Sequence, residues 1–209
     1  MEIKEKTIFD SYVLKFFFSI TSKIVLKILG WKIEGEAPKT KKYVLIAAPH
    51  TSNWDFLYTM LIAFALKLKV YVMAKKELFD GPAGPPLRWL GVIPIDRSKS
   101  NNIVAQAVQL FHKYDELVMV IPTSGTRQRV MKWKTGFYHI ANGAGVPISL
   151  GFLNYGKKTG GFGHLFQPTG DVEADMIEIK SFYTNISGKI PSFASSFVPL
   201  KIKLTETAY

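Results

Sequence analysis

Residues 43–67 read YVLIAAPHTSNWDFLYTMLIAFALK. The run YVLIAA, at 43–48, is short and apolar and is ended by a proline, which predicts a buried strand. The run WDFLYTMLIAFALK, at 54–67, follows Ser52 and Asn53, and either of these residues could cap a helix. A buried strand that passes through a short turn into a helix is typical of α/β proteins.

The same alternation of apolar runs and helical patterns continues along the chain. We predict further strands at 70–74, 91–97, 117–121 and 146–153, and further helices at 8–29, 101–114 and 134–144. Pro94 cannot donate a ladder hydrogen bond, so its strand belongs at an edge or a bend. This alternation indicates a mixed, mostly parallel sheet flanked by helices. No linker-like break divides residues 1–209, so we predict a single α/β domain; the segment from residue 171 onward stays unassigned.

The composition narrows the classes of partner. The chain has 209 residues, of which 47% are hydrophobic, and it carries a formal net charge of +11 and no cysteine. A positive excess favours an anionic partner, such as nucleic acid, an anionic membrane, a phosphorylated substrate or an acidic protein. The lack of cysteine excludes disulfides, thiolate catalysis and cysteine-ligated zinc. No helix-turn-helix, zinc or RNA-binding signature accompanies the charge, so we expect no nucleic-acid partner.

The predicted helix at 8–29 is amphipathic, with a polar series that recurs every four residues and an apolar series largely on other faces. The polar series is Ser11, Lys15, Ser19, Lys23 and Lys27, and the apolar series is Ile8, Val13, Phe17, Ile20, Ile24 and Ile28. Two interpretations are open. The helix packs on the protein's own sheet, or it lies in a membrane interface with its lysines at anionic headgroups.

Polar groups follow three of the predicted strands. His50 comes just after the strand at 43–48, Arg97 comes just after GVIPID, and the loop TSGTR, at 123–127, comes just after the strand at 117–121. Chemistry in open α/β sheets gathers beyond the carboxyl ends of the strands, so we expect these groups to converge. The loop offers hydroxyls, accessible backbone N–H groups and a guanidinium, which suit a phosphate. It is not a P-loop, because the glycine and lysine pattern of that motif is absent.

His50 and Asp55 could form a catalytic pair. In the first turn of the predicted helix, Asp55 is favoured in its ionised form by the helix dipole. Its carboxylate could accept a hydrogen bond from the ring of His50, which would fix the tautomer and stabilise the imidazolium. This is the logic of a catalytic triad whose nucleophile belongs to the substrate. The alternative is structural, because an aspartate in a first helical turn is a common capping aid.

Four blocks, in order, resemble those of the glycerolipid acyltransferases, the family that includes the lysophosphatidic acid acyltransferases. APHTSNWDF (48–56) resembles its H-x-x-x-x-D block, and GVIPIDRS (91–98) resembles its second block, which contains an arginine. IPTSGTRQ (121–128) resembles the third block, F-P-E-G-T-R-S, and VPISLGF (146–152) is similar to the fourth, a strand with a proline. The match covers roughly residues 43–153, which is most of the predicted domain.

The resemblance implies a role for each matching residue. His50 would act as general base on an acceptor hydroxyl that attacks an acyl thioester, and Asp55 would orient His50. The residues implied to hold the phosphate of the acceptor are Arg97, Ser124, Gly125, Thr126 and Arg127. The implied donor is acyl-CoA or acyl carrier protein, and no metal or redox cofactor is needed. The implied acceptor is a lyso-glycerophospholipid, with 1-acylglycerol-3-phosphate as the leading candidate.

Ser124 departs from the family pattern, which has a glutamate there. The change leaves open an altered lyso-lipid acceptor, or a non-catalytic basic protein that binds lipids at a membrane surface. A lipid acceptor also favours the membrane-interface interpretation of residues 8–29, because the acyl chain must reach the site without crossing water. We therefore expect peripheral or monotopic association with an anionic membrane, on its cytoplasmic face.

Overall fold

The computed structural model describes residues 3–96, 100–124 and 133–193, which form a seven-stranded sheet with the order β1-β7-β6-β2-β5-β3-β4. The strands are β1 (Lys32–Glu34), β2 (Lys42–Ala48), β3 (Tyr71–Lys75), β4 (Val92–Ile95), β5 (Leu117–Pro122), β6 (Ile148–Asn154) and β7 (Thr159–Phe166). Strands β2 to β6 run parallel to one another, whereas β7 runs antiparallel to β6 and parallel to β1. The predicted α/β class, with a mixed and mostly parallel sheet, is confirmed.

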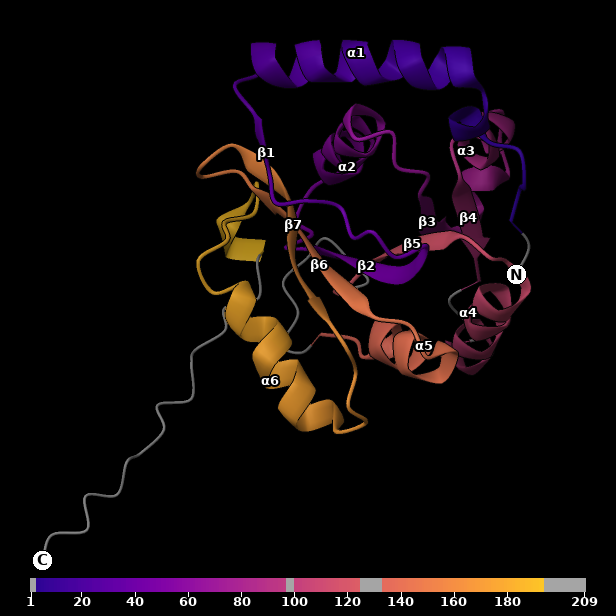
Figure 1. Cartoon of the computed structure of the whole chain (residues 1–209), viewed down its shortest axis with the longest axis vertical. Helices are drawn as coiled ribbons and strands as arrows, with labels where there is room; N and C mark the ends of the chain where they lie inside the picture. The colour runs from indigo at the N-terminus through magenta and orange to yellow at the C-terminus, as the bar shows by residue number, and fades with distance from the viewer. Residues whose placement is uncertain (1–2, 97–99, 125–132, 194–209) are drawn as a thin grey trace, which may run out of the picture.

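Helices cover both faces of this sheet (Figure 1). On one face lie α1 (Tyr12–Ile28) and α2 (Trp54–Ala65), with α2 between α1 and the sheet; on the other lie α4 (Ser100–Lys113), α5 (Gly136–Ala144) and α6 (Val172–Phe182). Shorter helical segments are η1 (Ile8–Asp10), η2 (Lys76–Phe79), α3 (Gly84–Trp89) and η4 (Pro191–Phe193). The sheet is therefore buried on both sides, which explains its near-continuous apolar strands.

Strand β2 lies in the middle of the sheet between β5 and β6. Its register pairs Ala47 with Pro122 of β5, and Ala48 with Phe152 of β6. Because these three strands are parallel, their carboxyl ends meet at one edge of the sheet. The chain segments that leave β2, β5 and β6 begin side by side at that edge.

The strands and helices predicted between residues 43 and 153 are all present, with ends that shift by a residue or two. Strand β4 lies at the sheet edge, as Pro94 predicted. The sequence analysis missed β1, α3 and β7 and left α6 unassigned. Strand β7 is rich in glycine and lacks a strand-like apolar alternation. The pairing of β7 with β1 requires a glycine at position 161, because a Cβ there would lie 2.0 Å from the carbonyl oxygen of Glu34.

Each face of the sheet has its own apolar core. Phe9 and Phe64 stack in the core under α1 and α2, with ring centroids 4.7 Å apart. In the opposite core, the carboxylate of Asp175 in α6 is buried and accepts hydrogen bonds from Tyr138 Oη at 2.7 Å, and from Thr169 N and Oγ1 at 2.7 and 2.8 Å. This buried network fastens α6 to α5.

Helix α1 contacts α2 through a narrow seam. Ser19, Ser22 and Leu26 are buried there, and Ser19 Oγ donates a hydrogen bond to the carbonyl oxygen of Ala65 at 3.1 Å. An apolar stripe at i, i+4, i+7, i+11 and i+15 faces away from the protein, with residues 44 to 77% exposed. We call it the outer stripe of α1, and it consists of Val13, Phe17, Ile20, Ile24 and Ile28.

The structure differs from the expected helix at 8–29 in two details. Ser19 belongs to the polar series but is buried, because its small side chain allows α1 to approach α2 closely. Ile8 was expected in the apolar series of the same helix. It lies instead in η1 and is buried in the core, because Ser11 caps α1 by accepting a hydrogen bond from Leu14 N at 3.4 Å. Within the described chain, no helix has the length and apolar character needed to cross a membrane.

Candidate active site

The turn between β2 and α2 carries His50 and Asp55. Asn53 is the N-cap residue of α2, but its side chain makes no capping hydrogen bond. Instead, Oδ2 of Asp55 accepts hydrogen bonds from the backbone N–H groups of Thr51 at 2.7 Å and Ser52 at 2.9 Å. The carboxylate of the first helical turn therefore closes the turn that precedes the helix. Its role is structural, but it does not cap the helix, because Thr51 and Ser52 both come before the N-cap residue.

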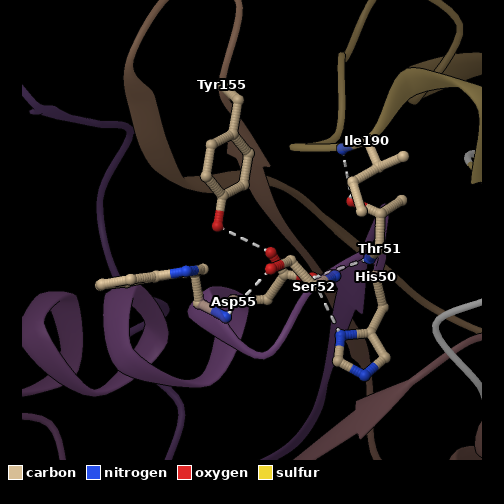
Figure 2. Close-up of polar contacts among 7 residues, drawn as sticks. His50, Thr51, Ser52, Asp55, Tyr155 and Ile190 are labelled. Atoms are coloured by element: carbon tan, nitrogen blue, oxygen red, sulfur yellow. Dashed lines mark hydrogen bonds and ion pairs between the residues drawn. The ribbon is translucent and has the colours of Figure 1, made fainter.

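The same carboxylate oxygen also faces the imidazole of His50 (Figure 2). Nδ1 of His50 lies 3.1 Å from Oδ2 of Asp55. An ionised carboxylate can only accept hydrogen bonds, so in the neutral imidazole the proton lies on Nδ1 and the lone pair lies on Nε2. The side chain of His50 is 23% exposed and that of Asp55 only 6%. A substrate can therefore reach the imidazole while the carboxylate stays behind it. Asp55 thus both closes the turn and contacts His50.

The surroundings of Asp55 keep it ionised. Burial by itself raises the pKa of this carboxyl group, but hydrogen bonds from His50, the backbone of Ser52, Tyr155 and the backbone of Thr51 outweigh burial. Together they hold the pKa of Asp55 below its ordinary value of 3.8. Asp55 is therefore negatively charged at neutral pH, and in this state it accepts a hydrogen bond from His50.

Tyr155 is a residue of this site that the sequence analysis missed. It lies directly after β6, and its hydroxyl donates a hydrogen bond to Oδ1 of Asp55 at 2.7 Å (Figure 2). Burial and the bond to Asp55 raise the pKa of Tyr155 well above its ordinary value of 10.0, so the hydroxyl remains a donor. Its position just after the predicted strand at 146–153 could have suggested Tyr155 as a site residue. The apolar pattern of the sequence, however, does not show which strand lies next to β2.

A segment after α6, residues 185–190, packs on the outside of the turn. The backbone N–H of Ile190 donates to Oγ1 of Thr51 at 3.2 Å, and the carbonyl oxygen of Ser187 accepts from the backbone N–H of Tyr155 at 2.9 Å. A Cβ on Gly188 would lie 2.8 Å from side-chain atoms of Thr51, so only glycine allows this approach. The segment supports both the His50 turn and Tyr155.

An apolar groove of about 450 Å³ opens beside His50. Its floor comes from β2, β3, β4 and β5, and its walls come from α2 and the connection between β3 and β4. The lining includes Ala47, Phe56, Thr59, Val72, Leu78, Leu87, Val92 and Val120. Lys75, at the end of β3, also lines the groove and was not singled out from the sequence. An alkyl chain in this groove could place a polar end group against the imidazole.

The structure describes only part of the predicted phosphate site. Ser124 follows β5 and is buried beside Thr123, which is also buried. Arg97, Gly125, Thr126 and Arg127 lie outside the described residues. The described strands that precede them, β4 and β5, run parallel to β2. Among residues 3–96, 100–124 and 133–193, no group of three or more metal-ligating side chains could hold a metal ion.

The sequence around this site matches a known family. Residues 31–149, which are more than half of the chain, match the family model described as Acyltransferase. The chain belongs to the acyltransferase family. The predicted membership of the acyltransferase family is thus confirmed, and both His50 and Asp55 lie within the matched region.

Curated acyltransferases resemble this chain over part of their length. The 1-acyl-sn-glycerol-3-phosphate acyltransferase of Haemophilus influenzae is 28% identical over 131 residues, which cover 58% of this chain and 53% of that protein. The Escherichia coli protein of the same name is 31% identical over 131 residues, which cover 58% of this chain and 52% of that protein. The chain therefore spans about half the length of the curated relatives it matches.

The fold is similar to that of a solved acyltransferase. The crystal structure of the 1-acyl-sn-glycerophosphate (LPA) acyltransferase from Thermotoga maritima superposes with a TM-score of 0.55. The likeness covers 84% of this chain and 82% of that one, at 15% sequence identity. At this identity the similarity concerns the fold alone.

Proposed function

We propose that this protein transfers a fatty acyl group from an acyl thioester to a hydroxyl of a lyso-glycerophospholipid, with 1-acylglycerol-3-phosphate as acceptor. The observation that carries the proposal is the His50–Asp55 pair beside an apolar groove. Family membership and the names of the curated relatives support the acyltransferase class and this acceptor.

The proposed chemistry needs one base and no cofactor. Nε2 of His50 takes the proton of the acceptor hydroxyl while the hydroxyl oxygen attacks the thioester carbonyl, and a C–O bond forms. The tetrahedral oxyanion then collapses, the C–S bond breaks, and His50 returns the proton to the leaving thiolate. Asp55 stabilises the transient imidazolium through its hydrogen bond to Nδ1. The donor is acyl-CoA or the acylated form of acyl carrier protein, and both are thioesters that this chemistry accepts.

We assign the phosphate of the acceptor to the loops that follow β4 and β5. Arg97 and Arg127 would bind it by charge-assisted hydrogen bonds, and the segment Ser124–Gly125–Thr126 would add hydroxyl and backbone N–H donors. Lys75 supports this assignment, because it brings a cation into the groove lining near His50. The serine at 124 in place of a glutamate removes a negative charge next to the phosphate.

We further propose that the protein works at the surface of an anionic membrane, on its cytoplasmic face. The outer stripe of α1 supports this, because it presents large apolar side chains to the surroundings while the inner seam packs on α2. A helix with this division of faces suits the interface between headgroups and acyl chains. Lys23 and Lys27 are exposed on the same helix and can meet anionic headgroups.

The test is an acyl-transfer assay with product identification. Purified protein receives vesicles that contain a mixture of lyso-lipids, together with labelled acyl-CoA or labelled acyl carrier protein, and the products are resolved by mass spectrometry. We expect labelled phosphatidic acid from 1-acylglycerol-3-phosphate. His50→Ala should lower the rate by about 10²–10⁴-fold, the usual contribution of a general base, without changing the thermal unfolding midpoint markedly.

Two other outcomes would redirect the proposal. Lyso-lipid binding without donor consumption would identify a non-catalytic lipid-binding protein, the alternative that the Ser124 departure left open. Product formed from a different lyso-lipid would keep the acyltransferase class and replace the acceptor. Near wild-type turnover by His50→Ala would remove the general base from the mechanism.

A further inference from the structure

The sheet topology brings Tyr155 to the catalytic turn. Strand β6 is a direct neighbour of β2 and runs parallel to it, with Ala48 paired to Phe152 at the ends of the two strands. The segments that leave both strands therefore start at the same edge. His50 lies just past β2 and Tyr155 just past β6, so a tyrosine 100 residues from Asp55 in sequence contacts its carboxylate.

The two oxygens of Asp55 are bonded unequally. Oδ2 is shared by three groups, the backbone N–H groups of Thr51 and Ser52 and Nδ1 of His50. Oδ1 is bonded by the hydroxyl of Tyr155 at 2.7 Å. Because the Asp55 side chain is only 6% exposed, water has little access to Oδ1, and the tyrosine replaces the solvent that an exposed carboxylate would have.

The ring of Tyr155 is held from several sides. It makes edge-on contacts with Trp31 and Tyr58, at centroid distances of 5.0 and 5.7 Å, and its backbone N–H donates to Ser187 at 2.9 Å. Trp31 and Tyr58 stack on each other at 4.1 Å. A ring confined in this way presents its hydroxyl at a fixed point, which is the condition for orienting a partner.

We propose that Tyr155 is a positioning residue: its hydroxyl holds the Asp55 carboxylate so that Oδ2 faces Nδ1 of His50, which keeps Nε2 unprotonated and ready to accept a proton. The consequence for turnover rests on the proposed acyltransferase function. The consequence for the His50 tautomer does not, because the tautomer depends only on the hydrogen bonds among these side chains.

Loss of the hydroxyl has a definite physical effect. A buried Oδ1 without a donor leaves the carboxylate free to rotate toward other donors or to take up a proton. In either case the bond from Nδ1 of His50 weakens, and the tautomer with the proton on Nε2 becomes populated. That tautomer cannot act as a general base toward an acceptor hydroxyl at Nε2.

The experiment compares Tyr155→Phe with Tyr58→Phe. The first variant removes the hydroxyl that contacts Asp55 and keeps the ring. The second removes the hydroxyl of a neighbouring ring in the same aromatic group and is the matched control. Nitrogen-15 NMR of histidine-labelled protein, at a pH where the imidazole is neutral, measures the tautomer of His50. The His50 resonances are assigned by their absence in His50→Ala. Steady-state kinetics gives kcat and both KM values.

We expect Tyr155→Phe to increase the Nε2-protonated tautomer of His50 and to lower kcat by roughly ten- to a hundredfold, the range for losing a hydrogen bond to a charged group. Both KM values should stay within about twofold, because the hydroxyl bonds Asp55 and Tyr155 does not line the groove. Tyr58→Phe should leave the tautomer and kcat unchanged.

Three results would overturn the proposal. The first is a Tyr155→Phe protein with the wild-type tautomer and wild-type kcat. The second is an equal loss in Tyr58→Phe, which would assign the effect to packing of the aromatic group. The third is a Tyr155→Phe protein that does not fold, which would make the hydroxyl a stability element. If the wild-type protein transfers no acyl group, the proposed function fails, yet the NMR comparison still decides the role of Tyr155.

Discussion

Asp55 combines two tasks that proteins often divide between residues. Its Oδ2 closes the turn before α2 through the backbone of Thr51 and Ser52, and the same atom faces His50. The turn therefore cannot relax without moving the imidazole. This coupling explains how a short segment, partly open to solvent, can hold a histidine with the precision that proton transfer requires.

At the scale of the single residue, we predict that Asp55→Asn strongly lowers the rate of acyl transfer. The amide is neutral and stabilises an imidazolium poorly, and its NH₂ group can support the wrong tautomer of His50. The kcat value should fall by about 10²–10⁴-fold, as expected when the partner of a catalytic histidine loses its charge. The measurement is kcat at saturating donor and acceptor.

Asp175→Asn is the matched control for this prediction. Asp175 is also a buried, hydrogen-bonded aspartate, but its hydrogen bonds go to Tyr138 and Thr169, neither of which lines the groove. Its substitution should lower stability and leave kcat largely intact at a temperature where the protein is folded. Similar kcat losses in both variants would mean that Asp55 acts through general stability.

At the scale of the element, α1 has two unlike sides. The inner side buries Ser19, Ser22 and Leu26, with the partly buried Leu14 and Phe18 packed beside them, whereas the outer stripe of α1 is exposed. Hydrophobic burial within the protein therefore does not account for most of the apolar side chains of the helix. The proposed membrane interface would account for them, because it offers these side chains a second apolar medium.

We predict that the triple variant Val13→Gln, Phe17→Gln, Ile24→Gln releases the protein from anionic vesicles. These exposed side chains bury little area in the folded chain, so the unfolding midpoint should change only slightly, whereas vesicle affinity should fall at least about tenfold. Co-sedimentation with vesicles measures the affinity, and binding by the wild type should also weaken as salt rises.

Leu26→Ala provides the contrast within the same helix. It truncates a buried side chain of the seam, so it should cost about 2–5 kcal/mol of stability while the outer stripe of α1 stays intact. Point substitutions separate the two sides more cleanly than deletion of residues 1–29, because that deletion also removes Ile8 and Phe9 from the core. Undiminished sedimentation of the triple variant would contradict the membrane role.

At the scale of the whole molecule, buried carboxylates connect folding to pH. For both Asp55 and Asp175, burial raises the pKa but hydrogen bonds outweigh it, so the folded pKa lies below the ordinary value of 3.8. A group with a lowered folded pKa contributes stability above its unfolded pKa, and this contribution is lost as the pH falls through the folded pKa.

We therefore predict that the contribution of these two groups to the free energy of unfolding is constant near neutral pH. Below about pH 4 this contribution decreases, and the protein becomes less stable. Asp175→Asn should lower stability at pH 7 by about 1–3 kcal/mol, because Tyr138 and Thr169 lose a charged acceptor. Its acid-induced loss should also be shallower than that of the wild type. Urea unfolding between pH 3 and pH 7 tests both points, and an acid dependence as steep as in the wild type would exclude Asp175 as a source.

Much of this architecture was predictable because it depends on residues that are close together in the sequence. The run at 43–67 contains the strand, the turn and the helix in order, and a separation of five residues is enough to let Asp55 reach His50. The strands and helices from 43 to 153 follow from apolar periodicity in the same way. Strand β7 was not predictable by these means, because its glycines are required by the close approach of β1 and carry no apolar alternation.

The sequence by itself thus determined the strand–turn–helix unit and the proximity of Asp55 to His50, since both depend on residues near one another along the chain. It also indicated the family, through four blocks in order along the chain. Only the tertiary structure decided which strand lies beside β2, and hence that Tyr155 bonds Asp55. It also decided which side of α1 is covered, because Ser19 lets α1 approach α2 and turns the outer stripe of α1 away. The physical reason is common to both: strand order and helix packing are set by contacts between distant segments, which local periodicity does not encode.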